Sequence, residues 1–513
     1  MSGRGGTGRR WGLKILCHWR AGSSPAVRTS LTRGLCAALI VTSTTSCGRR
    51  PDVGPVVASV IGGEPDLAAR RRGDLSTPDR VLTDALAEGL VRFDATGQIE
   101  PGIAERWIVT DNGMSYIFRL RDARWADGTP VRAAEVVALL RRQITLASDN
   151  RLAPFLTAVA SVVEMTPEVI EIELSRPRPD LLKLFAQPEM GLVRSARAGG
   201  AGPFRRREQR GPALVLTPAA DPDRDPAEAV PTPEDEVMLH GERASRAILR
   251  FVGRDSDLVL GGTLDDWPIM QAGNPAPANI RFDPAAGLFG LAVARRDGLL
   301  ASEAGRAAVA QAIDRADLSS FLPPDWAGRE TVLPEQFDSA TPPVPPPWAA
   351  LTREQRVAAA RASVASWHAL KGVPTLGIAL PDGPGGTLLW GRLARDLYAV
   401  GIRPRRLAWD DTTADLRLID QIAPYDSARW YLVTACVACS DDASAAIEAS
   451  RLAGTLPERA QRLATADAAL AADGAFITLG RPLRWSLVSL RLRQWQPNTR
   501  AWHPLNRLRG DPS

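Results

Sequence analysis

Two cysteines outside the first 47 residues, Cys436 and Cys439, have the Cys-x-x-Cys spacing that can carry chemistry. Such a pair can be a thiol redox site, half of a zinc site or a local disulfide. A redox pair should open a helix directly after a strand, whereas this pair lies beside the polar run 440–442. Zinc would need two further ligands, and the remaining histidines are far apart in the sequence. We therefore expect a disulfide, with two free thiols as the next interpretation and a thiol oxidoreductase as the enzyme alternative.

The sequence lacks the familiar catalytic motifs. It contains no G-x-x-x-x-G-K-[ST] loop, no dinucleotide fingerprint at a strand–helix junction, no H-E-x-x-H and no G-x-S-x-G. His240 and His368 are expected to be structural, and the carboxylate pairs 265–266 and 410–411 to lie in solvated turns. The 14 tryptophans could line a ligand cleft as well as fill a core. We expect a protein that is not an enzyme and that holds no metal and no cofactor.

The net charge of +5 comes from the N-terminal region. Seven of the 63 lysines and arginines, and none of the 58 aspartates and glutamates, lie in residues 1–47. The rest of the chain therefore has 56 basic and 58 acidic residues. A protein that binds nucleic acid needs its positive charge on the folded part. The charge distribution excludes nucleic acid as a partner.

Residues 1–47 are typical of an export signal. Basic residues precede the short apolar stretch 34–41, which is followed by small residues. The segment 44–47, with the sequence TTSC, is similar to a bacterial lipobox, although threonine stands where leucine is usual. If it acts as one, Cys47 carries a lipid that tethers the protein to a membrane surface. A cytosolic tail without structure is the alternative.

Mixed strands and helices predict an α/β fold, and 513 residues predict about two to four structural lobes. Hydrophobic residues alternate over 116–120 and 170–174, as in half-buried strands. Residues 375–409 predict a strand–helix–strand unit in a mostly parallel sheet. Loops are expected at 205–235 and 338–350, which are rich in proline.

Seven short segments follow one another in a recognisable order. They are an early E-G-L, a P-G-I-A-E stretch, a Y-x-F-x-L-R strand, a W-x-D-G-x-P turn, an A-x-E-V-V helix, a G-A-G-P-F crossing segment and an R-x-A-x-x-x-A-I-D-R helix. Their positions are 88–91, 97–107, 115–121, 125–130, 133–137, 200–204 and 306–315. This series resembles the family 5 extracellular solute-binding proteins, the oligopeptide, dipeptide and nickel binders of ABC importers. The resemblance covers roughly residues 55–480, and its first cluster of motifs is highly specific.

The resemblance implies a two-lobed, type II periplasmic-binding-protein fold with an extra small lobe inserted in the N-terminal lobe. The implied division is lobe I at 55–90, 195–270 and 481–513, lobe II at 91–194 and lobe III at 271–480. It implies a periplasmic monomer that captures a peptide or other small solute between lobes and delivers it to ABC permease subunits in the inner membrane. The alternative is a degenerate binding fold that acts as a sensor or scaffold without transport. The mark of that alternative would be a cleft filled by its own side chains.

The resemblance also implies ligand residues, because family members often hold a peptide's free amine with an aspartate in a gW-x-aDy-x-DP segment after a strand. The best alignment, over residues 415–427, puts Gln421 at the tryptophan and Pro424 at the amine-binding aspartate. A second register begins at Asp426 and needs an insertion. Charged capture of an amine is strong, so the loss of the aspartate predicts a changed selectivity. The predicted ligand residues are Asp420, Gln421, Tyr425 and Asp426.

A two-lobed binder needs a hinge where the chain crosses between lobes. The segment 199–202 has the sequence GGAG, which supplies a permissive backbone. We therefore predict that Gly200 and Gly202 are hinge residues.

Overall fold

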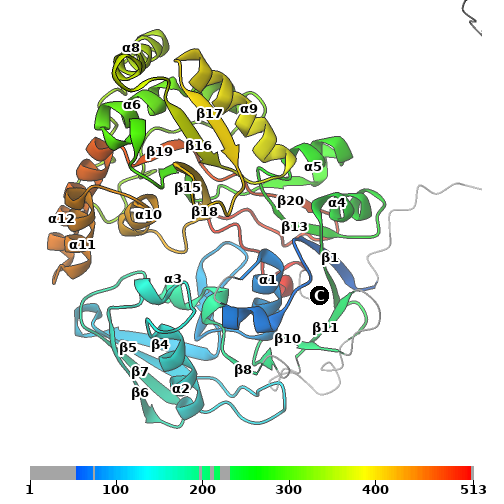
Figure 1. Cartoon of the computed structure of the whole chain (residues 1–513). Helices are drawn as coiled ribbons and strands as arrows, with labels where there is room; N and C mark the ends of the chain where they lie inside the picture. Colours follow the sequence, from blue (N-terminus) through cyan, green and yellow to red (C-terminus); the bar gives the residue numbers. More distant parts are fainter. Residues whose placement is uncertain (1–53, 73–74, 196–198, 208–212, 220–231, 510–513) are drawn as a thin grey trace, which may run out of the picture. The chain divides into compact units, whose positions relative to one another are not determined.

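The computed structural model of the chain forms two separate units, Met1–Pro51 and Asp52–Ser513, and every element given below belongs to the second (Figure 1). The predicted export signal at 1–47, the lipid site at Cys47 and part of the loop expected at 205–235 lie outside the described residues. The structure describes residues 54–72, 75–195, 199–207, 213–219 and 232–509.

A mixed sheet of seven strands takes its strands from distant parts of the sequence. Its centre is β1, which runs parallel to β12 on one side and to β13 on the other. The outer strands are antiparallel to their neighbours. In spatial order the strands are β10 (Phe204–Arg206), β11 (Leu214–Pro218), β12 (Val237–Glu242), β1 (Val56–Ile61), β13 (Leu258–Gly262), β20 (Trp485–Val488) and β14 (Ile280–Phe282).

A second sheet has five strands, and one of them, β15, is a continuous apolar run that is buried over its whole length. The strand–helix–strand prediction for 375–409 is confirmed by β16, α9 (Pro384–Ala399) and β17, whose strands are parallel. The prediction of a mostly parallel sheet is wrong. β15 and β19 connect directly to strands of the first sheet, and they run antiparallel to each other. In spatial order the strands are β17 (Arg403–Leu407), β16 (Thr375–Ala379), β18 (Leu416–Ile422), β15 (Gly287–Val293) and β19 (Phe476–Gly480).

A third sheet is antiparallel and has α2 (Ala133–Ile144) packed on one face. It confirms the strands predicted at 116–120 and 170–174. Tyr116, Phe118 and Leu120 are buried, whereas Ile117 and Arg119 between them are more exposed, as period-two alternation requires. In spatial order the strands are β4 (Ala104–Thr110), β5 (Ser115–Leu120), β7 (Val169–Leu174) and β6 (Val159–Thr166).

The remaining helices lie around the sheets (Figure 1). None of the helices that the structure describes combines the length and the apolar character needed to cross a membrane. Short paired strands are β2 (Val91–Phe93) with β3 (Ile99–Pro101), and β8 (Val193–Ser195) with β9 (Gly199–Gly200). The helices are α1 (Thr77–Leu86), α3 (Leu181–Phe185), α4 (Ala244–Val252), α5 (Trp267–Gly273), α6 (Glu303–Ala312), α7 (Arg315–Ser319), α8 (Arg353–Lys371), α10 (Ala428–Ala435), α11 (Asp441–Leu452) and α12 (Leu456–Asp473).

The chain passes twice between the seven-stranded and the five-stranded sheet. The first crossing, 283–286, leads from β14 to β15, and the second, 481–484, leads back from β19 to β20. The N–H of Asp283 donates to the carbonyl oxygen of Arg484 at 3.1 Å, so the two crossings lie side by side. The sequence analysis did not predict that the two crossings are hydrogen-bonded to each other.

The predicted hinge residues lie on a different crossing, which leads from the antiparallel sheet to the seven-stranded sheet. A Cβ added to Gly200 would lie 2.2 Å from the carbonyl oxygen of Leu192, and one added to Gly202 would lie 2.4 Å from the carbonyl carbon of Leu86. Both glycines therefore permit close backbone packing, which is a structural reason for their presence besides conformational freedom. Their role as a hinge stays a prediction.

This packing predicts that Gly202→Ala destabilises the protein by about 1–3 kcal/mol, because the methyl group has no space against the end of α1. Gly391→Ala is the matched control, since it lies within α9 and its added Cβ would have no neighbour within 4 Å. Replacing a helical glycine by alanine should raise stability by about 0.5–1 kcal/mol. Thermal unfolding of both variants measures the difference. Equal effects of the two substitutions would contradict the packing account.

Candidate functional site

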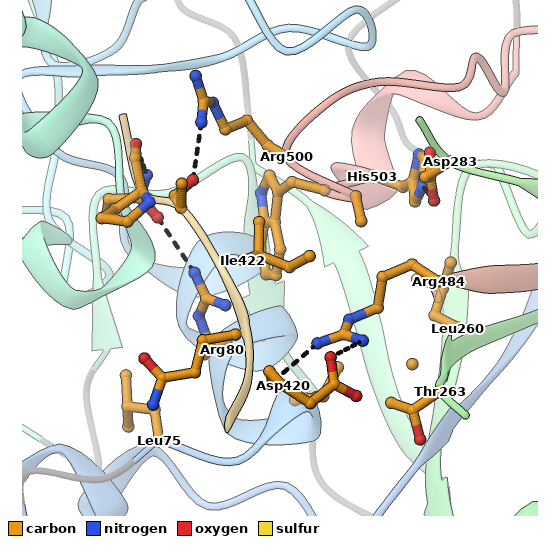
Figure 2. A pocket seen from close by; sticks show the side chains of 18 of the residues that line it. Leu75, Arg80, Leu260, Thr263, Asp283, Asp420, Ile422, Arg484, Arg500 and His503 are labelled. Atoms are coloured by element: carbon orange, nitrogen blue, oxygen red, sulfur yellow. Dashed lines mark hydrogen bonds and ion pairs between the residues drawn. The ribbon is translucent and has the colours of Figure 1, made fainter. Parts of the chain in front are cut away.

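A cavity of about 380 Å³ lies among segments that adjoin the three sheets (Figure 2). Its wall combines the start of α1, the end of β18, the second crossing and a stretch close to the C-terminus. The volume lies in the range of sites that hold small molecules. Its lining side chains come from 75–81, 151–155, 187–189, 260–263, 420–424, 430–434, 484–486 and 500–503, together with Asp283.

Asp420 and Gln421 line the cavity because they lie at the end of β18, which pairs with the buried strand β15 along its whole length. The Nη1 of Arg484 donates to Oδ1 of Asp420 at 2.8 Å (Figure 2). Nη2 of the same guanidinium donates to the main-chain oxygen of Asp420 at 3.1 Å. Burial raises the pKa of Asp420, and Arg484 opposes that shift. The carboxylate in the wall is therefore already ion-paired.

The other two predicted ligand residues lie behind the cavity wall. Tyr425 is fully buried, and its ring packs edge-on against Phe155 with the centroids 5.9 Å apart. The carboxylate of Asp426 binds Lys183 at 2.5 Å and also binds Arg500. Burial would raise the pKa of Asp426, but Arg500 and Lys183 together lower it, so the group is charged at neutral pH. Tyr425 and Asp426 thus contact wall residues rather than the cavity.

The order of elements distinguishes the two registers that the sequence allowed. β18 ends at Ile422, a short loop follows, and α10 begins at Ala428. The first register, which places the strand before Gln421 and the loop after it, agrees with this order. The register that starts a strand at Asp426 is wrong, because the residues that follow form a helix.

Three contacts join α3 and its neighbours to the loop after β18, and we call them the α3 latch. Nε2 of Gln187 donates to the carbonyl oxygen of Pro424 at 2.7 Å. Lys183 pairs with Asp426, and Phe155 packs against Tyr425, as described above. The latch ties Phe155 and residues 183–187 to residues 424–426, which lie more than 230 residues further along the sequence and border the same cavity.

The stretch close to the C-terminus supplies wall residues that the sequence analysis missed. Ala501 has a φ of 47°, in the left-handed region that non-glycine residues rarely adopt. Asn498 stabilises this turn, because its Oδ1 accepts the N–H groups of Arg500 and Trp502 at 3.0 and 3.2 Å. The turn places Arg500 and His503 in the cavity wall (Figure 2). Trp502 also lines the cavity. The abundance of tryptophan was the one signal that pointed to such residues.

Cys436 and Cys439 are joined in a disulfide in the structure, with their Cα atoms 5.3 Å apart. The bond lies between α10 and α11, and α10 carries Trp430 and Thr434 of the cavity wall. Within the described ranges, no group of three or more histidine, cysteine, aspartate or glutamate residues is placed to hold a metal ion. The site offers ion pairs and aromatic surface for binding a solute.

Residues 98–366, more than half of the chain, match the sequence model of the bacterial extracellular solute-binding proteins, family 5. The chain belongs to this family. Family 5 proteins are the periplasmic substrate-binding proteins of ABC importers, and relatives of this chain bind peptides. These relatives are binding proteins rather than enzymes.

Individual relatives align with this family 5 protein over short stretches. The probable deoxycholate-binding periplasmic protein YgiS of Escherichia coli is 28% identical over 145 residues, which is 25% of this chain and 27% of that protein. The periplasmic oligopeptide-binding protein OppA of Haemophilus influenzae is 35% identical over 95 residues, 18% of this chain and 17% of that protein. The alignments therefore span about a quarter or less of these relatives.

The likeness in fold extends over almost the whole chain. The murein tripeptide binding protein MppA of Escherichia coli matches with a TM-score of 0.73 at 17% sequence identity. The match covers 89% of this chain and 98% of that one. The predicted two-lobed, periplasmic-binding-protein-like α/β fold is thereby confirmed.

The α3 latch predicts a local effect of Lys183→Ala. Loss of the ammonium group breaks the pair with Asp426, so α3 and residues 424–431 should open more often. Hydrogen–deuterium exchange should become several-fold faster in both segments. Lys371→Ala, at the exposed end of α8, is the control and should change neither. Unchanged exchange in Lys183→Ala would show that the latch does not depend on this pair.

Asp84 predicts a pH dependence of stability. Burial raises the pKa of Asp84, which contacts Trp502, to about 7, although Arg92 favours the charged form. Between about pH 4 and pH 7 the folded protein therefore holds a proton that the unfolded chain has released, so stability falls as pH rises through this interval. The thermal midpoint of Asp84→Asn should fall by several degrees less over this interval than that of the unmodified protein. The midpoint of Asp411→Asn, whose exposed carboxyl has a lowered pKa, should fall as much as that of the unmodified protein. Parallel falls in all three proteins would contradict this account.

Proposed function

We propose that this chain is the exported solute-binding component of an ABC importer. It captures a peptide or similar small solute in the cavity and delivers it to permease subunits in the inner membrane. It acts in the periplasm as a monomer, directed there by residues 1–47, and a lipid on Cys47 tethers it to a membrane. Capture requires no nucleophile, metal or cofactor, only a space that excludes water and wall groups that pair with the solute.

The single observation that carries this proposal is the cavity of about 380 Å³ at the place where the α3 latch, the end of β18 and the C-terminal stretch meet. Its wall contains three tryptophans, Trp430, Trp485 and Trp502, beside charged groups. Aromatic walls with a few placed polar groups are typical of small-molecule sites. The matches to peptide-binding relatives support the same class of solute.

The second candidate function is a sensor or scaffold without transport. It would have a cleft filled by its own side chains. Lys183 and Arg500 do occupy the carboxylate of Asp426, but this group lies behind the cavity wall and does not fill the cavity. The cavity volume that remains favours capture.

Native mass spectrometry of protein purified gently from its own cell envelope tests the proposal. We expect a small non-covalent adduct that is lost on unfolding. The site variant is Ile422→Trp, whose larger side chain should take up part of the cavity and reduce the amount of adduct (Figure 2). Protein that carries no adduct, and that gains no thermal stability from peptide, nickel or haem pools, would favour the scaffold.

A further inference from the structure

A second cavity, of about 390 Å³, shares no lining residue with the first. Its wall is formed by parts of α6, α8, the end of α12, β19 and the proline-rich loop that precedes α8. The volume lies in the range of sites that hold small molecules. The capture function proposed above makes no use of this space.

Most residues of this second wall are apolar. They include Trp348 and Phe476, together with valines, leucines, alanines and two prolines. Trp348 and both prolines belong to the loop that the sequence predicted at 338–350. Apolar walls with a few placed polar groups are typical of small-molecule sites, and such a surface favours a ligand with a hydrocarbon body.

Arg315 is a buried cation of this wall, with 8% of its surface exposed. Its Nε donates to the carbonyl oxygen of Thr478 at 2.8 Å, and its Nη1 donates to that of Ala310 at 3.1 Å. The guanidinium carbon lies 5.2 Å from the centre of the Trp348 ring. In the described part of the chain no carboxylate binds Arg315, and Glu330 favours its charge only from a distance.

The Nη2 nitrogen of Arg315 is available to a ligand. Among the described residues it donates to no acceptor, and it is not one of the nitrogen atoms that the protein seals from solvent. Burial lowers the pKa of Arg315 to about 10, so the group still carries its charge at neutral pH. A buried charge without a counter-ion is costly, and an anion beside Nη2 would reduce this cost.

The other charged residues of the described wall are either paired or exposed. Glu330 binds Arg356 through both carboxylate oxygens. Arg306 donates to the main-chain oxygen and to the carboxylate of the residue that ends α12. Glu303 is exposed at the start of α6, where water and salt screen its charge. An acidic ligand can therefore reach Arg315 without displacing a carboxylate.

We infer that the second cavity binds a small organic acid with an apolar body, and that Arg315 receives its carboxylate. Hydrogen bonds between a guanidinium and a carboxylate are charge-assisted and stronger than neutral ones. An amide of the same shape would gain neutral hydrogen bonds alone, and an amine would place a second positive charge beside Arg315. The site is separate from the first cavity, so the inference does not depend on the capture function.

Isothermal titration calorimetry on the full chain tests the inference with three ligands of similar shape, phenylacetate, phenylacetamide and phenethylamine. Arg315→Gln removes the charge, and Ala307→Leu adds bulk to the partly exposed wall on α6. Ala358→Leu is the matched control, because Ala358 is exposed on α8 and does not line the cavity. Ile422→Trp alters the first cavity instead. Thermal unfolding checks that each variant is folded.

We expect phenylacetate to bind at least about ten-fold more tightly than the amide or the amine. Ala307→Leu should weaken this binding by a similar factor, because the added side chain takes up space in the cavity. Arg315→Gln should lower the affinity for phenylacetate to that for the amide. Ala358→Leu and Ile422→Trp should leave it unchanged.

Equal binding of phenylacetate and phenylacetamide, or binding of neither, would overturn the inference. Phenylacetate binding that survives Ala307→Leu and is lost in Ile422→Trp would also overturn it, since the ligand would then occupy the first cavity. If Arg315→Gln does not fold, Ala307→Leu and the comparison of acid with amide still decide. These outcomes leave the capture function standing, because that function is tested by the adduct on the native protein.

Discussion

The hydrogen bond between Asp283 and Arg484 is the contact on which the geometry of the site depends. It holds side by side the two segments that carry the chain between the seven-stranded and the five-stranded sheet. The side chains of the same two residues face the cavity, one bound to His503 and the other to Asp420. Residues of the crossing are therefore also residues of the wall. The two crossings are short, since each joins a strand of one sheet directly to a strand of the other, β14 to β15 and β19 to β20.

The ion pairs in the cavity wall affect which solutes can bind more strongly than they affect the stability of the fold. Burying a charge is costly, and a close partner offsets much of that cost without adding a large net gain. The raised pKa of Asp420, despite its contact with Arg484, shows the cost of burial at this position. Asp426 shows the opposite balance, because two basic partners lower its pKa in spite of burial. The charges at both positions are thus balanced within the protein.

Much of the framework could be predicted from the sequence, because it follows from local periodicity. The alternation at 116–120 and the strand–helix–strand pattern at 375–409 are each recognised from residues that lie only a few positions apart in the sequence. Asp420 could be predicted as a wall residue since it ends a strand in a recognisable segment. Tyr425 shares that segment, yet nothing in the local sequence tells which side of the wall a loop side chain occupies. Arg500 belongs to a turn that depends on Asn498, and such non-periodic contacts are visible only in three dimensions.

The C-terminal stretch, residues 498–503, links the first crossing to the cavity wall. This link restricts how the two sheets can move relative to each other. The N–H of Asn498 donates to Asp283 at 3.0 Å, and the carbonyl oxygen of Thr499 accepts the N–H of Ala286 at 2.8 Å, so the stretch is bonded to the first crossing. Two residues further on, Arg500 donates to the carbonyl oxygen of Ala423 in the wall at 2.7 Å. A change of angle at the crossing must carry this stretch with it or break these bonds. Gly200 and Gly202, by contrast, lie close to the backbone of Leu192 and of the end of α1, and their role as a hinge stays a prediction. We therefore expect a solute that contacts residues 500–503 to shift the paired crossing, because the same few hydrogen bonds hold the C-terminal stretch and the crossing together.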